Sequence, residues 1–290
     1  MNQHTDFIDE VIVEDEINSS YIKKVKTYKK KIQTTYINVL SKANKYKIDK
    51  GEYVALSFID INDLSTRTSL EKLLKYNIMY YLQKYLKKEK NKILIVGLGN
   101  RNIVADALGP IVINHIEVNN HLEENDTKVA AVSLGVMAQT GMETSDLLTS
   151  ICNEFKPNLV ILIDALATKN IKRINKSVQL NDVSISPGSG VFNFRKEINM
   201  KTLNAPLISL GVATVVEAYS IIKDTILFLE EKYYFNKRVD MHIIEDLLPS
   251  EDNFFVTPKS IDSDIEILGN IIARAINKAC KEWKNEEVHH

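Results

Sequence analysis

Two aspartates, Asp106 and Asp164, lie beyond short apolar runs, and each is followed by Ala-Leu. Such runs predict buried β-strands, and in an open α/β sheet the loops beyond the carboxyl ends of the strands gather at one crevice. Two carboxyl groups held close together resist double ionisation, so one of them keeps its proton. The pair then supplies a general base that activates water and an acid that protonates a leaving amide nitrogen. The pattern therefore indicates peptide hydrolysis, although an aspartate before a helix can also act only as an N-cap.

Other catalytic chemistries have weaker support. The loop 187–190 could present backbone N–H groups to a developing oxyanion, but Ser189 within it would need a histidine base to act as a nucleophile. None of the six histidines lies in a loop after a predicted strand, which argues against a Ser-His triad and against a zinc or nickel site. Gly97 and Gly99 lack the third glycine of a dinucleotide-binding fingerprint. We therefore expect no cofactor and no metal.

Three further residues are candidates for supporting the aspartates or binding substrate, because they lie in the same set of loops. They are Asn100, Glu143 and Ser189. Cys152 and Cys280 fall within predicted helices, where we expect packing roles.

The strands that would position these residues are predicted from four runs that are short, rich in β-branched residues or leucine, and not alternating. This is typical of parallel strands covered on both faces. Helical patterns or Gly/Asp loops follow them, which predicts an α/β fold: a three-layer, mostly parallel open sheet with helices on both faces. The runs are Ile93–Leu98, Val129–Leu134, Leu159–Ile163 and Leu207–Leu210, with a further strand at Tyr53–Ile59.

Helix starts are indicated by capping patterns. Thr68 and Glu71 have capping-box spacing, so a helix is predicted to begin at Thr68. A second helix is predicted to begin near Thr144 or Ser145. Thr257 followed by proline predicts the N-cap of the last helix. That helix has one apolar face, formed by Ile261, Ile265, Leu268, Ile272, Ala275, Ala279 and Trp283.

Charge is unevenly distributed along the chain. The 37 Lys and Arg residues nearly balance the 38 Asp and Glu residues, and a net charge of −1 excludes general capture of nucleic acid or of an anionic membrane. Residues 1–19 hold six acids and no Lys or Arg, whereas residues 20–50 hold ten lysines and one acid. These segments could be solvated, or the acidic leader could fold back over a basic patch. We expect an N-terminal extension over residues 1–50 and one α/β catalytic domain over residues 51–290.

Composition predicts a cytoplasmic protein. Two cysteines are too few for a disulfide framework, which fits a reducing compartment. No apolar run approaches the roughly 20 residues of a membrane span, and the N-terminus lacks the basic and apolar regions of a secretory signal.

Seven blocks of sequence, in order between about residues 93 and 260, resemble the germination proteases of spore-forming bacteria. Together they are far more specific than any one block. The blocks are Val96–Asn100 with Asp106–Pro110, Gly135–Met137 with Thr140–Asp146, Ile163–Ala167, Pro187–Val191, Arg195–Lys196, Gly211–Val212 with Thr214–Val216, and Val256–Lys259.

The resemblance implies an endopeptidase that degrades small acid-soluble spore proteins during germination, is made as a self-processing zymogen, and assembles as a homotetramer in the spore. The catalytic aspartates of the family map by motif onto Asp106 and Asp164. The family's leader is cut in a Thr-Asp/Leu-Ala-x-Glu type of sequence, which Thr5–Glu10 resembles. The implied self-cleavage bond joins Asp6 to Phe7, making residues 1–6 a propeptide. The family also looks like a relative of hydrogenase maturation proteases, with a phosphorylase/hydrolase-like fold.

Two alternatives stay open. One is a metal-dependent endopeptidase with the hydrogenase-maturation layout, and the other is a catalytically silent, peptide-binding sporulation paralogue. The second depends on departures from the family's pattern at Arg101, Leu134, Ser186, Phe192, Phe194 and Ala213.

Overall fold

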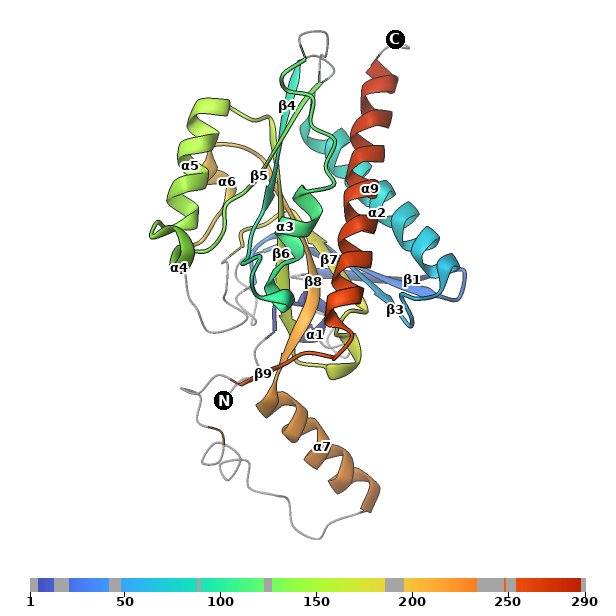
Figure 1. Cartoon of the computed structure of the whole chain (residues 1–290). Coiled ribbons are helices and arrows are strands. Elements are labelled where there is room, and N and C mark those ends of the chain that lie inside the picture. The colour runs from blue at the N-terminus through green and yellow to red at the C-terminus, as the bar shows by residue number, and fades with distance from the viewer. Residues whose placement is uncertain are drawn as a thin grey trace.

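The computed structural model describes residues 5–12, 21–41, 48–87, 90–122, 127–185, 196–233, 248 and 254–287. Within these ranges, one sheet of nine strands runs through the molecule and helices pack on both of its faces (Figure 1). The predicted three-layer α/β architecture is thus confirmed. None of the helices in the described ranges is long and apolar enough to cross a membrane.

The sheet has the order β1-β2-β3-β7-β8-β6-β4-β5, and β9 pairs with β8. Its strands are β1 (Tyr21–Tyr28), β2 (Ile32–Val39), β3 (Gly51–Phe58), β4 (Asn91–Gly97), β5 (Thr127–Ser133), β6 (Leu159–Thr168), β7 (Ser177–Asn181), β8 (Leu207–Glu217) and β9 (Phe255–Val256).

The sheet is mixed rather than mostly parallel. Strands β5, β4, β6 and β8 pair in parallel, as the apolar runs predicted. Strands β1, β2, β3 and β7 extend the sheet with antiparallel pairs. The lysine-rich stretch therefore contributes β1 and β2 to the same sheet as the strands that follow residue 50. Its lysines face solvent on β1, which forms one edge of the sheet and has no fully buried residue.

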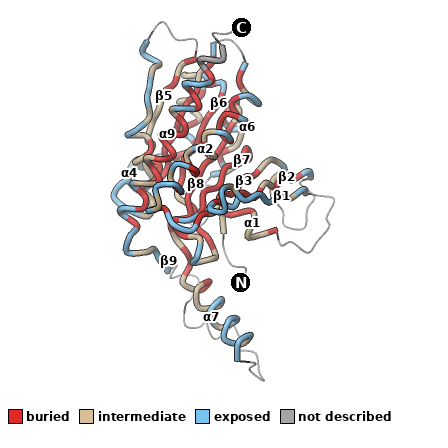
Figure 2. The backbone as a smooth tube through the Cα atoms, turned by 90° about the vertical axis from the view of Figure 1, so that its right-hand side faces the viewer, coloured by how far each residue is buried: buried red, intermediate tan, exposed pale blue. Residues whose placement is uncertain are grey.

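The helices form two outer layers. On one face, α2 (Leu64–Tyr85), α3 (Leu108–Ile113) and α9 (Ile261–Glu287) cover the larger apolar core. On the other face, α5 (Thr144–Phe155) and α6 (Met200–Leu203) cover a smaller core that includes Cys152. Figure 2 shows the buried residues concentrated in the central strands and along the inner side of α9. All seven predicted core residues of α9 are buried.

Helices α2 and α9 do not begin where the capping patterns predicted. The N-cap of α2 is Asp63, whose carboxylate accepts hydrogen bonds from the backbone N–H groups of Ser65 and Thr66. Thr68 instead donates its hydroxyl to the Leu64 carbonyl oxygen within the helix. Thr257 donates to the Thr214 carbonyl oxygen, so it ties the chain to β8 and α9 begins only at Ile261.

Strands β6 and β8 are longer than their apolar runs. Both continue past the ends of their neighbours, and a bulge between Leu166 and Ala167 interrupts their register. Asp164 therefore lies inside a strand rather than in the loop after it.

Beyond β8, α7 (Ala218–Tyr233) extends away from the body of the molecule (Figure 1). At the opposite edge from β1, β5 is only partly buried, which corrects its prediction as a strand covered on both faces.

Candidate active site

A cavity of about 690 Å³ lies at the carboxyl ends of β4, β5 and β6 and beside β8. Asp106 and Asp164 both line it, as the positions of the strand ends predicted. The same cavity is lined by residues of the N-terminal leader, from Thr5 to Ile8. The leader and the two aspartates thus meet in one place.

Asp164 lines the cavity from β6. It lies in β6 in register with Gly211 of β8, which is in turn in register with Gln179 of β7. Residues paired in this way present their side chains on the same face of a sheet. Gly211 has no side chain between the other two, and the Leu166 side chain packs over it, since a Cβ there would lie only 2.5 Å from Leu166 Cγ. The carboxylate of Asp164 is buried, and its Oδ1 accepts a hydrogen bond from the Ala165 N–H at 2.9 Å.

Asp106 is placed by a tight loop after β4. It ends the 3₁₀ turn η1 (Val104–Asp106), and its Oδ2 accepts the Asn100 backbone N–H at 2.7 Å. Gly99 makes this loop possible because its φ is +101° and a Cβ there would lie 2.0 Å from the Asp106 carbonyl oxygen. Asn100 therefore supports Asp106 through its backbone, while its side chain accepts a hydrogen bond from Gln139.

The other two predicted supporting residues are placed differently. Glu143 is the residue before the first turn of α5, and among the described residues it is not part of the cavity lining. Ser189 and the loop 187–190 lie outside the described residues. Within the described ranges, no three His, Cys, Asp or Glu side chains come together as a metal-binding group.

The leader crosses β6 at Asp6. Its N–H donates to the Ala167 carbonyl oxygen at 3.0 Å, and its Oδ2 accepts the Ala167 N–H at 2.8 Å. The carboxylate thus replaces a backbone acceptor at the bulge of β6. This arrangement favours a short acidic side chain at this position.

The next leader residues are held by apolar contacts. Phe7 has no exposed surface and rests on Leu166 and Ala213. The Arg173 guanidinium covers the ring from the other side, at 4.4 Å from its centroid. Ile8 begins the short helix α1 (Ile8–Val11) and packs in a separate cluster over β2 and β3. That cluster includes Ile12, Ile37, Val39, Tyr53 and Val183.

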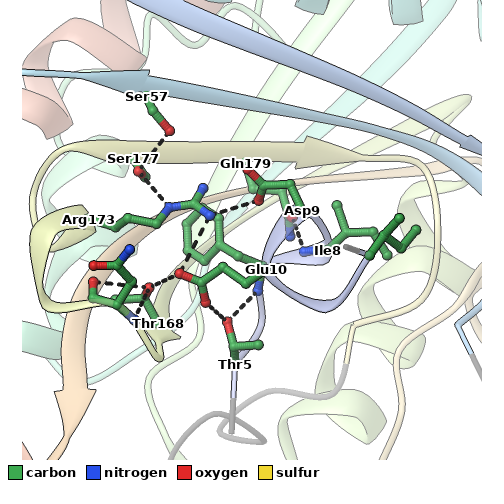
Figure 3. Close-up of polar contacts among 12 residues, drawn as sticks. Thr5, Ile8, Asp9, Glu10, Ser57, Thr168, Arg173, Ser177 and Gln179 are labelled. Carbon is green, nitrogen blue, oxygen red and sulfur yellow. Dashed lines mark hydrogen bonds and ion pairs between the residues drawn. The ribbon is translucent and has the colours of Figure 1, made fainter. Parts of the chain in front are cut away.

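The leader's acids contact basic and polar groups after β6. Arg173 Nη1 lies 2.9 Å from Asp9 Oδ1 and 3.5 Å from Glu10 Oε1 (Figure 3). Thr168 donates its hydroxyl to Glu10, and the Lys169 N–H donates to Glu10 Oε2 at 3.1 Å. Within the described residues the acidic leader therefore does fold back, and the recorded partners of its acids include Arg173 and Lys169. From the lysine-rich stretch, Lys23 Nζ donates to the Ile12 carbonyl oxygen of the leader at 3.4 Å.

One buried carboxamide spans the Asp6–Phe7 bond. Gln179 Nε2 donates to the Asp6 carbonyl oxygen at 2.8 Å, and Gln179 Oε1 accepts the Ile8 N–H at 2.9 Å. The sequence analysis missed Gln179 and Arg173. The signal for Gln179 was the alternation of polar and apolar residues in Ser177–Asn181, which predicts a short strand with one polar face.

Comparison with known proteins gives one consistent family. The germination protease family, Peptidase_A25, matches residues 4–238. The germination protease of Clostridium tetani is 36% identical over 277 residues, which cover 86% of this chain and 85% of that protein. The germination protease of Bacillus cytotoxicus is 35% identical over 286 residues, which cover 79% of this chain and 78% of that protein. Among solved structures, a NiFe hydrogenase maturation protease from Thermococcus kodakarensis matches 68% of this chain and 98% of its own, at 15% identity and a TM-score of 0.31.

Proposed function

Because this chain belongs to the germination protease family, we propose that it is an aspartate-dependent endopeptidase, made as a self-processing zymogen, that degrades small acid-soluble spore proteins during germination. The observation that carries the proposal is the docked leader. The Asp6–Phe7 bond, implied as the self-cleavage site by the sequence, lies in the cavity that Asp106 and Asp164 line. The leader then occupies the place that a substrate chain takes later.

The reaction follows from the two carboxyl groups. One, ionised, takes a proton from a water molecule whose oxygen bonds to the Asp6 carbonyl carbon. The other, protonated, gives its proton to the Phe7 nitrogen as the C–N bond breaks. The products are a carboxylic acid at residue 6 and an amine at residue 7, and the two aspartates have exchanged protonation states.

The leader contacts also suggest which peptides the site accepts. A short acid before the bond would bind the Ala167 N–H, as Asp6 does. A large apolar side chain after the bond would fill the space between Leu166, Ala213 and Arg173. Acids three and four residues after the bond would pair with Arg173 and bind Lys169. This pattern favours acidic, partly apolar segments of a substrate protein.

The test is to express Asp106→Asn and Asp164→Asn chains and compare them with the unsubstituted chain. N-terminal sequencing of the unsubstituted protein should find Phe7 as a new terminus, and a spore-protein peptide with an acid–hydrophobic bond should be cut. Each Asn variant should lose both activities by at least about 10³-fold, since each removes a proton carrier. Retained activity in either variant would end the aspartate-pair mechanism.

The same assay separates the two alternatives. Activity lost on chelation and restored by a divalent metal would identify the metal-dependent endopeptidase. Tight binding of the peptide with no turnover, even after the leader is removed, would identify a silent peptide-binding protein.

Assembly as a homotetramer in the spore cytoplasm is part of the same proposal. What supports it is α7, of which only Tyr219 and Ser220 are buried in the single chain. Its outer half exposes Leu227, Phe228, Leu229 and Tyr233. Exposed apolar groups on one element are typical of an interaction surface. Sedimentation equilibrium should give four times the mass of the 33.0 kDa chain, and a monomer mass would overturn this assignment.

A further inference from the structure

The carboxamide of Gln179 contacts the leader on both sides of one peptide bond. Its Nε2 donates to the carbonyl oxygen of Asp6 at 2.8 Å, and its Oε1 accepts the N–H of Ile8 at 2.9 Å. The bond between Asp6 and Phe7 therefore lies between the two hydrogen bonds. A single side chain fixes the carbonyl group before the bond and the direction of the chain after it.

The position of Gln179 in the sheet relates it to Asp164. The two residues lie in register on either side of Gly211, across β7, β8 and β6, and they share a face of the sheet. Two strand spacings, of about 4.8 Å each, separate their backbones. Gly211 has no side chain of its own, and the Leu166 side chain lies over it, since a Cβ at Gly211 would be 2.5 Å from Leu166 Cγ. The Asp6 carbonyl oxygen reaches the Gln179 carboxamide beside this contact. Asp164 and Gln179 both line the cavity that also holds Asp6.

Burial makes the carboxamide dependent on the leader. Gln179 is 3% exposed, and a buried amide without hydrogen-bond partners costs free energy. Among the described residues, the hydrogen bonds recorded for its side chain both go to the leader. Val178 and Leu180 point to the opposite face of β7, and the residues that share the face of Gln179 are the polar Ser177 and Asn181. A glutamine here is explained by the peptide that it binds.

We propose that Gln179 is a catalytic residue of this site and forms its oxyanion-binding group, an inference that rests on the proposed function. When water attacks the Asp6 carbonyl carbon, the π electrons of the C=O bond move to the oxygen that Gln179 Nε2–H already contacts. A preorganised donor of this kind stabilises the developing negative charge. When the tetrahedral intermediate collapses, the electrons return, the C–N bond breaks, and Gln179 neither gains nor loses a proton. A substrate chain in the cavity receives the same two hydrogen bonds.

The experiment compares the full chain with Gln179→Met, which keeps the length of the side chain and removes its donor and acceptor. Gln179→Asn keeps a carboxamide with a shorter reach and serves as a second variant. Gln83→Met, on the exposed face of α2, is the matched control. The first measurement is the single-turnover rate at which Phe7 appears as a new N-terminus, by mass spectrometry. The second is amide hydrogen exchange over residues 6–8 in an Asp164→Asn background, which reports whether the leader stays docked without cutting.

We expect Gln179→Met to slow self-processing by about 10²–10³-fold, the loss typical of one oxyanion donor. Protection of residues 6–8 should fall by no more than about tenfold, because apolar contacts of Phe7 and Ile8 and the ion pairs of Arg173 remain. The self-processing rate of Gln179→Asn should lie between those of Gln179→Met and the unsubstituted chain. Gln83→Met should match the unsubstituted chain in both measurements.

Two results would overturn the inference while leaving the proposed function standing. One is a Gln179→Met rate within threefold of the unsubstituted chain. The other is a fold-loss in self-processing rate no larger than the fold-loss in hydrogen-exchange protection of residues 6–8. Gln179 would then only help to dock the leader. If the unsubstituted chain fails to cut the Asp6–Phe7 bond under every condition, the proposed function itself fails, and the role of Gln179 fails with it.

Discussion

Replacing Phe7 with alanine tests how firmly the leader is held in the cavity. Phe7 has no exposed surface, packs on Leu166 and Ala213, and is covered by the Arg173 guanidinium at 4.4 Å. An alanine would lose most of these contacts while leaving the backbone hydrogen bonds of Asp6 in place. The substitution therefore lowers the stability of the docked leader relative to the undocked one.

The size of the effect follows from the contacts. Burying a phenylalanine side chain is worth about 1.5–3 kcal/mol. The stacked guanidinium adds about 0.5–1 kcal/mol. Because the leader can leave and water can take its place, we add no further cost for an empty cavity. A total of about 2–4 kcal/mol corresponds to an increase of about 30- to 700-fold in the undocked population, at about 1.4 kcal/mol for each factor of ten.

Amide hydrogen exchange at Ile8 measures that population, because its N–H is bonded to Gln179 only when the leader is docked. The measurement is made on an Asp164→Asn chain, so that no cutting occurs. Ile59→Ala is the control, since it removes a similar side chain that is 77% exposed, and it should change the exchange rate by less than twofold. An exchange rate at Ile8 that rises less than threefold in Phe7→Ala would refute the packing argument.

Two further predictions concern ion pairs. Arg173→Met leaves Asp9 and Glu10 without their buried cation, so self-processing should slow by about 100-fold or more. Arg173→Lys should not restore the rate, because lysine lacks the planar group that covers the Phe7 ring. A rate equal to that of the unsubstituted chain in either variant would contradict this. Burial favours a higher pKa for Glu71, but hydrogen bonds from Lys278 and Arg274 outweigh it and hold the pKa below the ordinary 4.5. A depressed carboxyl pKa stabilises the fold above about pH 4.5 and loses this contribution as the pH falls below it. Glu71→Gln should therefore cost on the order of 1 kcal/mol in urea unfolding at pH 7 and almost nothing at pH 3, and an equal cost at both pH values would contradict the reasoning.

The meeting of Asp106 and Asp164 could be predicted from sequence because it depends on a general property of parallel strands. Apolar runs located β4 and β6, and the carboxyl ends of neighbouring parallel strands point to one crevice. The exact end of β6 could not be predicted in this way. It continues through Asp164 to Thr168 because it pairs with an equally long β8, and pairing partners are not visible in a single run.

Strand β1 and the leader contacts could not be predicted from the sequence, for related reasons, although β3 was predicted from its apolar run. Strand β1 is exposed and lysine-rich, so it lacks the apolar pattern on which strand prediction depends. Arg173 and Gln179 lie more than 160 residues from the leader residues they contact. Their roles arise only when β6, β7 and the leader are brought together in the fold. Patterns of nearby residues in the sequence do not predict such long-range contacts.

The burial of Phe7 has a consequence for the self-processing that we propose. Hydrolysis between Asp6 and Phe7 separates residues 1–6 from the chain, but residues 7–12 remain covalently joined to β1 through residues 13–20. A ligand on so short a tether experiences an effective concentration in the millimolar range. The newly formed N-terminal segment is thus a product that competes with every incoming substrate for the same contacts. Turnover of other proteins would then be limited by how often this tethered segment leaves the cavity.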